Sequence, residues 1–147
     1  MIFPQRSRRQ RGVTLIELLI VIVIVSILAS IAIPGYRAYV IRVNRIDGKS
    51  RLLSFASRLE RCFTRTNNYT ISGDAGGAAC LALPFTNPEG TYTFTGNIQA
   101  LAFTLTATPI NGQAQDTKCT TLTIDQTGLQ GATGTLTPLQ CWSGSGG

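Results

Sequence analysis

The sequence contains no histidine, and its seven acidic residues are scattered along the chain. Histidine is the most frequent general base in enzymes and a standard nitrogen ligand of zinc, so both uses are excluded. Asp74, Asp116 and Asp125 are too widely spaced to form a calcium-binding loop. The sequence also has no glycine-rich loop of the kind that holds phosphate groups between a strand and a helix. We therefore expect no enzyme activity, no bound metal and no cofactor.

Basic residues are nearly missing from the second half of the chain. After residue 66 only Lys118 is basic, against four acidic residues: Asp74, Glu89, Asp116 and Asp125. The net charge of +6 comes from arginines before residue 66, four of which lie within the first 11 residues. Binding to DNA requires clustered basic side chains. The composition therefore argues against a nucleic acid partner, although Arg61 and Arg65 would be available for one.

The four cysteines lack the spacing of a metal site. Cys62, Cys80, Cys119 and Cys141 contain no Cys-x-x-Cys pair, which argues against zinc. In a small chain outside the reducing cytosol, an even number of cysteines favours disulfides. Three connectivities are open, and we choose local pairing, Cys62–Cys80 and Cys119–Cys141. Each bridge would close a loop of roughly 20 residues.

A long apolar run lies near the amino terminus. From Leu18 to Ile33 the only polar side chains are Ser26 and Ser30. A helix over the 21 residues from 13 to 33 would be about 32 Å long, enough to cross the hydrocarbon core of a bilayer. The arginines before it would hold the amino terminus in the cytoplasm.

Glu17 is a costly residue in such a helix unless its carboxylate reaches a partner or the membrane interface. Thr14 and Glu17 fit a capping box, and Glu17 also lies near enough to the start of the run to reach the lipid headgroups. A third interpretation is a secretory signal cleaved after Ser30-Ile31-Ala32. The run is longer than the apolar region of a signal peptide, and Glu17 interrupts it, so we favour a retained helix.

Residues 12–19, Gly-Val-Thr-Leu-Ile-Glu-Leu-Leu, resemble the processing site and stalk of type IV pilins. The resemblance implies that residues 1–12 are a basic leader, and that prepilin peptidase cleaves between Gly12 and Val13. The same enzyme would methylate the new amino terminus of Val13. Glu17 would be the fifth mature residue, matching the glutamate of the family, whereas Val13 replaces the usual phenylalanine. Residues 59–69, 118–125 and 141–142 further resemble PilE-type minor pilins.

This resemblance implies a structural subunit of a type IV pilus, acting in pilus assembly, twitching motility and adhesion. Its partners would be other pilins, through the amino-terminal helix, the prepilin peptidase and an inner-membrane assembly platform. The chain would span the inner membrane once, with its domain in the periplasm, and would be extracellular after assembly. In a filament Glu17 would pair with a Val13 amine. Two alternatives stay open: a type II secretion pseudopilin, and a pilus-displayed module for DNA uptake or adhesion.

The remaining sequence predicts how the helix continues. Pro34 should kink or loosen it, because proline lacks a backbone donor and crowds the preceding turn. Residues 13–34 would form the hydrophobic helix, and an amphipathic half would follow over residues 35–66. Gly48 should lower the stability of this half of the helix, because glycine has a low helix propensity. The expected apolar stripe of this half consists of Tyr36, Val40, Val43, Ile46, Leu53, Ala56, Leu59 and Phe63.

Residues 67–147 should form a loop and a small sheet. Polar and apolar residues alternate over 91–95, 101–108 and 121–124, which predicts three antiparallel strands, and 139–142 would add a fourth. Turn residues lie at 87–90, 111–112 and 125–128. We therefore expect an α+β fold: a long amino-terminal helix, with a hydrophobic stalk and an amphipathic half, packed on an antiparallel β-sheet of three or four strands.

Overall fold

The computed structural model describes residues 12–71, 73 and 79–144. The chain divides after Arg37 into two compact units, and helix α1 (Leu15–Thr66) contributes residues to both. The helix runs through Pro34 without ending there. It ends where we expected, and the next residue, Asn67, adopts a left-handed backbone with φ +51°. The proposed leader lies outside the described residues, apart from Gly12.

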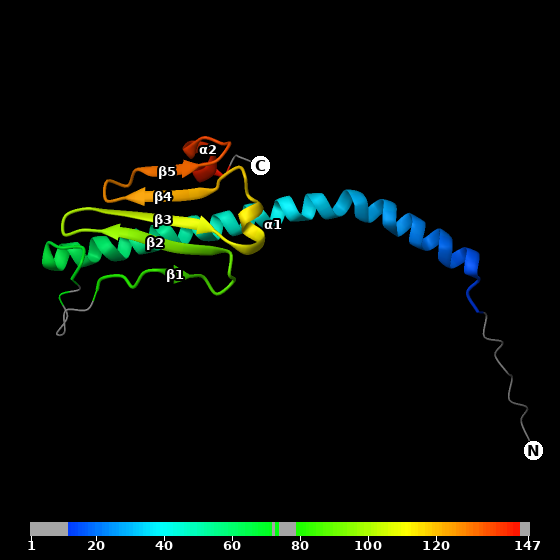
Figure 1. The fold of residues 1–147 in the computed structure, drawn as a ribbon, viewed down its shortest axis with the longest axis horizontal. Helices are drawn as coiled ribbons and strands as arrows, with labels where there is room; N and C mark the ends of the chain where they lie inside the picture. Colours follow the sequence, from blue (N-terminus) through cyan, green and yellow to red (C-terminus); the bar gives the residue numbers. More distant parts are fainter. Residues whose placement is uncertain (1–11, 72, 74–78, 145–147) are drawn as a thin grey trace, which may run out of the picture. The chain divides into compact units, whose positions relative to one another are not determined.

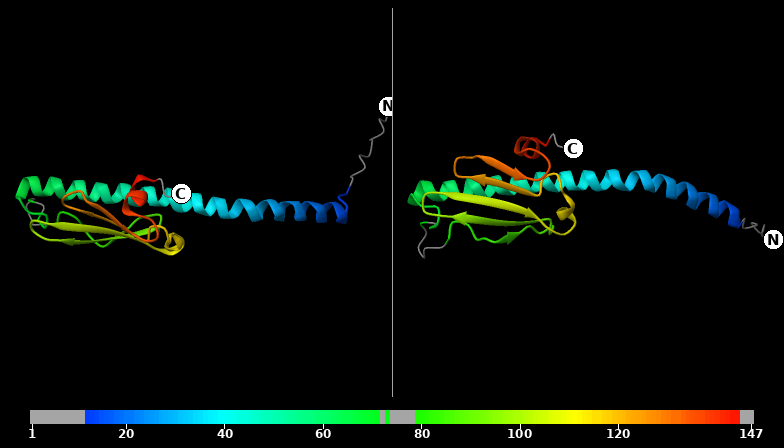
Figure 2. Two further views of the ribbon diagram at one scale, coloured as in Figure 1. Left: turned by 90° about the horizontal axis from the view of Figure 1, so that it is seen from above. Right: turned by 45° about the horizontal axis from the view of Figure 1, so that its top comes forward.

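Residues 38–147 form the expected α+β domain. Five antiparallel strands follow each other in sheet order: β1 (Phe85–Thr86), β2 (Tyr92–Ile98), β3 (Phe103–Pro109), β4 (Thr121–Asp125) and β5 (Gln130–Thr133). The 3-10 helix η1 (Asn111–Gln115) connects β3 to β4, and helix α2 (Pro138–Ser143) follows β5. Figures 1 and 2 show the sheet as one layer and the later turns of α1 as the other.

The alternating sequence sets the strand register. Phe94 of β2 lies opposite Ala107 of β3, which in turn lies opposite Leu122 of β4. All three side chains are buried, and the threonines between them face away from the core. The turns expected at 87–90 and 125–128 are present, since Gly90 N donates to Asn87 O at 2.9 Å and Gly128 N donates to Asp125 O at 3.0 Å. Residues 111–112, expected to be a turn, instead begin the 3-10 helix η1.

Two strands and one helix differ from the prediction. Over the described residues the sheet has five strands rather than the three or four expected, because the sequence did not indicate β1 and β5. β1 is only two residues long, and β5 reads Gln-Gly-Ala-Thr, which lacks the β-branched alternation of a typical strand. Residues 139–142 are not a strand but part of α2. Thr137 caps this helix, Pro138 begins it, and Thr137 and Gln140 form a capping box.

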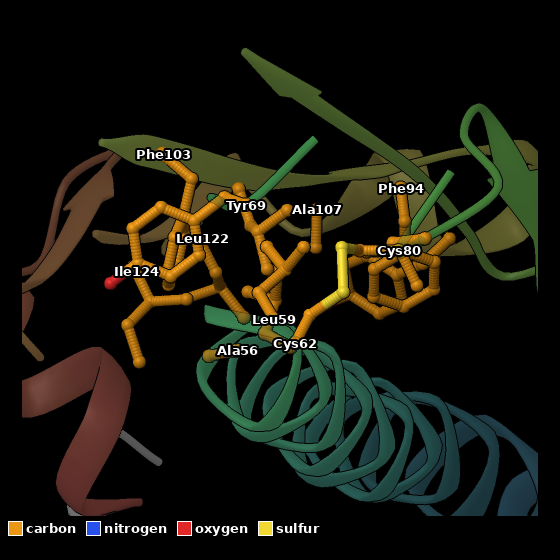
Figure 3. Packing of buried hydrophobic residues seen from close by; sticks show 14 of the residues in the cluster. Ala56, Leu59, Cys62, Tyr69, Cys80, Phe94, Phe103, Ala107, Leu122 and Ile124 are labelled. Carbon is orange, nitrogen blue, oxygen red and sulfur yellow. A yellow bond between two sulfur atoms is a disulfide. The ribbon is translucent and has the colours of Figure 1, made fainter. Parts of the chain in front are cut away.

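The buried face of α1 also differs from the expected stripe. Ala56 and Leu59 are buried as predicted, but Ile46 and Leu53 are exposed. The true buried face of α1 combines apolar, polar and small residues: Arg45, Gly48, Lys49, Leu52, Ala56, Leu59 and Cys62. Figure 3 shows Leu59 and Cys62 of α1 pointing toward the side chains of the sheet. The prediction failed because it counted only apolar residues, whereas three buried positions are Arg45, Gly48 and Lys49.

Candidate functional site

The amino-terminal end of α1 is held by a side-chain cap. Thr14 Oγ1 accepts a hydrogen bond from the backbone N–H of Glu17 at 3.3 Å, and Thr14 O accepts one from Leu18 N at 3.1 Å. Thr14 therefore caps the helix, which agrees with one half of the capping box that was one of three interpretations of this segment. Glu17 lies in the first turn, where a negative charge suits the helix dipole. Within the described part of the chain, no cation forms an ion pair with Glu17.

After Glu17, the helix exposes an apolar surface that no charged residue interrupts before Arg37. Its large aliphatic side chains from Val13 to Ile33 are between 46% and 82% exposed. The two serines do not interrupt this surface, because Ser26 Oγ donates to Ile22 O at 2.6 Å and Ser30 Oγ donates to Ile27 O at 2.7 Å. The most apolar 18-residue window of α1 has a mean hydropathy of 3.0. By length and composition, α1 is able to cross a bilayer.

A buried ion pair attaches α1 to the connection between β3 and β4. Arg45 Nε and Nη2 donate to the two carboxylate oxygens of Asp116 at 2.9 and 2.8 Å, and both side chains are almost fully buried. Asp116 also accepts backbone hydrogen bonds from Lys118 and Cys119. A bidentate arginine–carboxylate pair fixes both position and orientation, so this contact anchors the start of the domain on the helix.

Gln113 of η1 extends this polar contact. Its side-chain amide donates to Ile41 O and to the Tyr92 hydroxyl, both at 3.1 Å, and its oxygen accepts from Asn44 Nδ2 at 3.1 Å. Gln113 is 2% exposed and all of these groups have partners. Burial raises the pKa of Tyr92 to about 12, so its hydroxyl is neutral at physiological pH.

A second polar contact lies along the β1–β2 turn. Asn87 is buried and uses its side-chain oxygen to accept from the backbone N–H groups of Thr91 and Tyr92. Its amide also donates to Asp47 of α1 at 3.2 Å. Asp47 forms an ion pair with Arg51, which reaches Glu89 of the same turn. The turn predicted at 87–90 is therefore also a docking point for the helix.

Two disulfides cross-link parts of the domain that are distant in the sequence. Cys62 at the end of α1 is bonded to Cys80, and Cys119 before β4 is bonded to Cys141 of α2. These are the same pairs that we chose from the sequence. The first bridge holds the chain that leaves α1, and the second holds α2 beside the sheet. All four cysteines are buried within the domain.

The candidate site residues that the sequence indicated are not all in one part of the structure. Gly12, Val13, Glu17 and Pro34 all lie in the first unit, before residue 38. The polar anchors in the domain were not predicted, because Arg45 is one of several arginines along α1 and no neighbouring residue marks it for burial. Whether a charged residue of a helix is buried depends on the residue that it contacts. For Arg45 that residue is Asp116, which lies 71 positions away in the sequence.

Comparisons with known proteins agree with this fold and with the amino-terminal motif. A family model described as type IV minor pilin ComP, DNA uptake sequence receptor, matches residues 34–123. A second model, the prokaryotic N-terminal methylation motif, matches residues 7–33. The two matches cover different parts of the chain, so together they span residues 7–123, which include the apolar helix segment and most of the domain.

Individual relatives come from pili and from a secretion system. The chain is 33% identical over 87 residues to type II secretion system core protein G of Pectobacterium carotovorum subsp. carotovorum, covering 59% of this chain and 55% of that protein. It is 43% identical over 70 residues to a fimbrial protein of Moraxella nonliquefaciens, covering 44% and 46% of the two chains. The chain thus spans about half the length of these curated relatives.

A solved structure of a type IV pilin from Shewanella oneidensis is also similar. It is 26% identical, covers 61% of this chain and 89% of its own, and has a TM-score of 0.42. Membership is decided by the family model, which matches 90 of the 147 residues (34 to 123). The chain belongs to the family of type IV minor pilins that the ComP model describes.

Proposed function

We propose that this chain is a structural minor subunit of a type IV pilus, with no enzyme activity of its own. The observation that supports this most directly is the apolar surface of α1 from Val13 to Ile33, which the rest of its own unit leaves uncovered. Residues 38–147, by contrast, have a complete packed core. An apolar surface of this size is stable only in lipid or against other apolar helices.

Before assembly, the apolar segment would lie in the inner membrane with the domain in the periplasm. The internal hydrogen bonds of Ser26 and Ser30 suit this environment, because hydrocarbon offers no other partners. During assembly the lipid would be exchanged for the same segment of neighbouring subunits. The inner-membrane platform and the prepilin peptidase are the partners that this route requires.

Processing between Gly12 and Val13 would supply the missing partner of Glu17. Cleavage creates a positively charged amine at Val13, about one helical turn from the carboxylate. A carboxylate in an apolar bundle is strongly unfavourable unless it is paired with a cation. Mass spectrometry of the mature chain should find a methylated Val13 at its start, and a chain that starts at Ile33 would refute this processing.

The Glu17→Ala variant tests the assembly mechanism. Removing a carboxylate from an apolar helix should leave membrane insertion intact or improve it. Incorporation should nevertheless fall at least tenfold, because the pairing with Val13 is lost. The measurement is the amount of the subunit in sheared pili relative to its amount in the inner membrane.

The Thr14→Ala variant is the matched control, because it removes the cap without removing the charge. A lost cap costs about 1 kcal/mol, so this variant should still assemble. If Glu17→Ala enters pili as well as the unmodified chain does, Glu17 is only a residue of the helix start and the charge-pair mechanism is wrong.

A secretion pseudopilin is the main alternative, motivated by the similarity to core protein G. Both kinds of subunit carry an apolar helix of this type, so the helix does not separate them. A strain from which this chain is deleted distinguishes the two functions. Loss of pili and twitching with normal secretion supports the pilus subunit, whereas loss of secretion with normal twitching supports the pseudopilin.

DNA binding is a second candidate function, because the family description names a DNA uptake sequence receptor. Arg58, Arg61 and Arg65 are exposed and lie three and four residues apart, on one side of α1. Together they form a basic stripe on the helix surface, and the count of basic residues alone did not reveal this clustering. Replacing all three by alanine should weaken binding to duplex DNA and reduce its salt slope by about 3.

Arg42→Ala is the control for this experiment, because Arg42 is also exposed on α1 but lies outside the stripe. It should change the salt slope by less than the triple variant does. Full-length protein that shows no salt-dependent binding to duplex DNA would exclude this second function and leave the structural one intact.

A further inference from the structure

A groove lies between α1, β5 and α2, on the domain side of the helix. It has a volume of about 340 Å³ and is lined by Ile46, Lys49, Ser50, Leu53, Gln130 and Trp142. Ile46 and Leu53 are 54% and 45% exposed, so their side chains form an apolar rim. The indole of Trp142 is fixed as one wall, because its Nε1 donates to Gly131 O at 2.8 Å.

Lys49 places a positive charge in this apolar groove. The side chain is 9% exposed, and its Nζ donates to Trp142 O at 3.1 Å. No carboxylate among the described residues forms an ion pair with it. Asp116, which pairs with the neighbouring Arg45, already accepts two arginine and two backbone hydrogen bonds. Burial, and then the charge of Arg45, lower the pKa of Lys49.

The simplest role of Lys49 is to satisfy a carbonyl at the end of α2. That role uses one of its three N–H groups and leaves the buried charge without an anion from the described residues. A buried charge of this kind is unfavourable, and an incoming carboxylate would relieve it. The groove therefore complements a ligand that is aliphatic along its length and carries one negative charge.

An exposed apolar side of α1, within residues 38–147, leads to the groove. Tyr39 and Val43 are 61% and 43% exposed, and they precede Ile46 at helical spacing on the same side of α1. A neighbouring subunit that packs along α1 would therefore reach Leu53 and Lys49. We propose that this groove receives an aliphatic segment bearing one carboxylate from a neighbouring pilin subunit. The inference rests on the proposed function as a pilus subunit.

A photo-crosslinking amino acid placed at Ile46 or Leu53 of the full-length chain, in a piliated strain, tests the proposal. Adducts in sheared pili should join this subunit to another pilin, and the linked peptide should contain Asp or Glu among aliphatic residues. The control position is Leu101, which is 72% exposed and does not line the groove. It should give several-fold less of the same adduct.

Charge variants separate the groove from general crowding in the filament. Lys49→Met should reduce the adduct yield several-fold, and Lys49→Arg should retain most of it. Ser50→Glu adds a carboxylate at the exposed rim and should also lower the yield several-fold. Trp142 fluorescence and the intact Cys119–Cys141 bridge verify that α2 remains in place in each variant.

Several results would overturn the proposal. They are equal adduct yields at Leu53 and Leu101, adducts only within the same chain, or a yield that Lys49→Met and Ser50→Glu both leave unchanged. In these cases the subunit is still present in pili, so the proposed function survives. Absence of the unmodified subunit from pili would overturn both proposals, and the incorporation measurement tells the two failures apart.

Discussion

Gly48 lies at a close contact between α1 and Tyr92 of β2. A Cβ atom at this position would lie 3.1 Å from the ring of Tyr92, which is fully buried and hydrogen-bonded by Gln113. In an isolated helix, glycine costs about 1 kcal/mol relative to alanine. Here the contact with Tyr92 reverses that preference, because the ring has little room to move.

The Gly48→Ala variant should therefore lower the free energy of unfolding by about 1 kcal/mol, despite its better helix propensity. The measurement is urea unfolding of the detergent-solubilised chain, followed by the fluorescence of Trp142, the only tryptophan. Gly35→Ala is the control, because nothing lies within 4 Å of a Cβ at that position. A Gly48→Ala variant that is as stable as the unmodified chain would contradict the close-packing explanation.

Tyr92 should make the stability of the domain depend on alkaline pH. Burial raises its pKa to about 12, whereas an unfolded tyrosine titrates near pH 10. The folded state thus favours the neutral phenol. This contribution is fully present below about pH 10 and is lost as the pH rises toward 12, a change of roughly 2 kcal/mol.

Urea midpoints measured from neutral pH to about pH 12 test this dependence. Tyr92→Phe should flatten the alkaline part of the profile. At neutral pH it should cost about 1 kcal/mol, because the amide of Gln113 loses one acceptor. An alkaline profile that is the same in both proteins would assign the pH dependence to other groups.

At the scale of elements, α2 depends on local capping more than on its length. Thr137 Oγ1 accepts from Gln140 N at 3.3 Å, and the Gln140 side chain accepts from Thr137 N at 3.1 Å. Gly144 ends the helix with a left-handed backbone. A six-residue helix is unstable alone, so these caps and the tertiary contacts of Cys141 and Trp142 keep it folded.

Thr137→Ala removes the Oγ1 acceptor of Gln140 N and keeps the backbone N–H that donates to the Gln140 side chain, and it should cost about 1 kcal/mol. Because Trp142 lies in the same helix, its fluorescence should also become more accessible to a soluble quencher. Thr135→Ala is the control, since no side-chain hydrogen bond of this exposed threonine is observed. Equal quenching in the two variants would mean that the disulfide alone positions α2.

Helix α1 shows how one element serves two environments. Its first turns expose aliphatic side chains throughout, whereas its later turns bury one face against the sheet. The charges at its ends agree with the helix dipole, with Glu17 in the first turn and Arg65 in the last. Both ends of the helix thus carry charges that suit its dipole, and among the described residues its buried positions lie in its second part.

For the molecule as a whole, the two disulfides supplement a modest core. They link residues 18 and 22 positions apart. Each should contribute about 3 kcal/mol in the chain-entropy model. A domain of this size is typically stable by 5–15 kcal/mol, so losing both bridges removes a large share of the total.

Replacing both cysteines of either pair by serine should lower the free energy of unfolding by about 3 kcal/mol. Replacing all four should leave a domain that is marginal at 37 °C. Urea unfolding with and without reductant measures the effect, and the all-serine chain is the control because reductant should not change it. Peptide mapping that links Cys62 to Cys119 or Cys141 would contradict the observed pairing.

Several features follow from the sequence alone because they depend on neighbouring residues. An apolar run of this length predicts a helix that needs lipid or other helices, and Thr14 predicts its cap. Strict alternation around Phe94, Leu105 and Leu122 predicts strands with one buried face. The capping box of Thr137 and Gln140 was also readable, and the expected strand at 139–142 was wrong because that signal was overlooked.

Other features were decided only when distant parts of the chain met. Arg45 is buried because Asp116, 71 residues away, neutralises it, and Gly48 lies where a side chain would press on the ring of Tyr92. Strand β5 forms because β4 offers it backbone partners, not because Gln130–Thr133 favours a strand. Local propensity is set by a few adjacent residues, whereas burial of a charge or close packing of two backbones depends on partners that only the tertiary fold supplies.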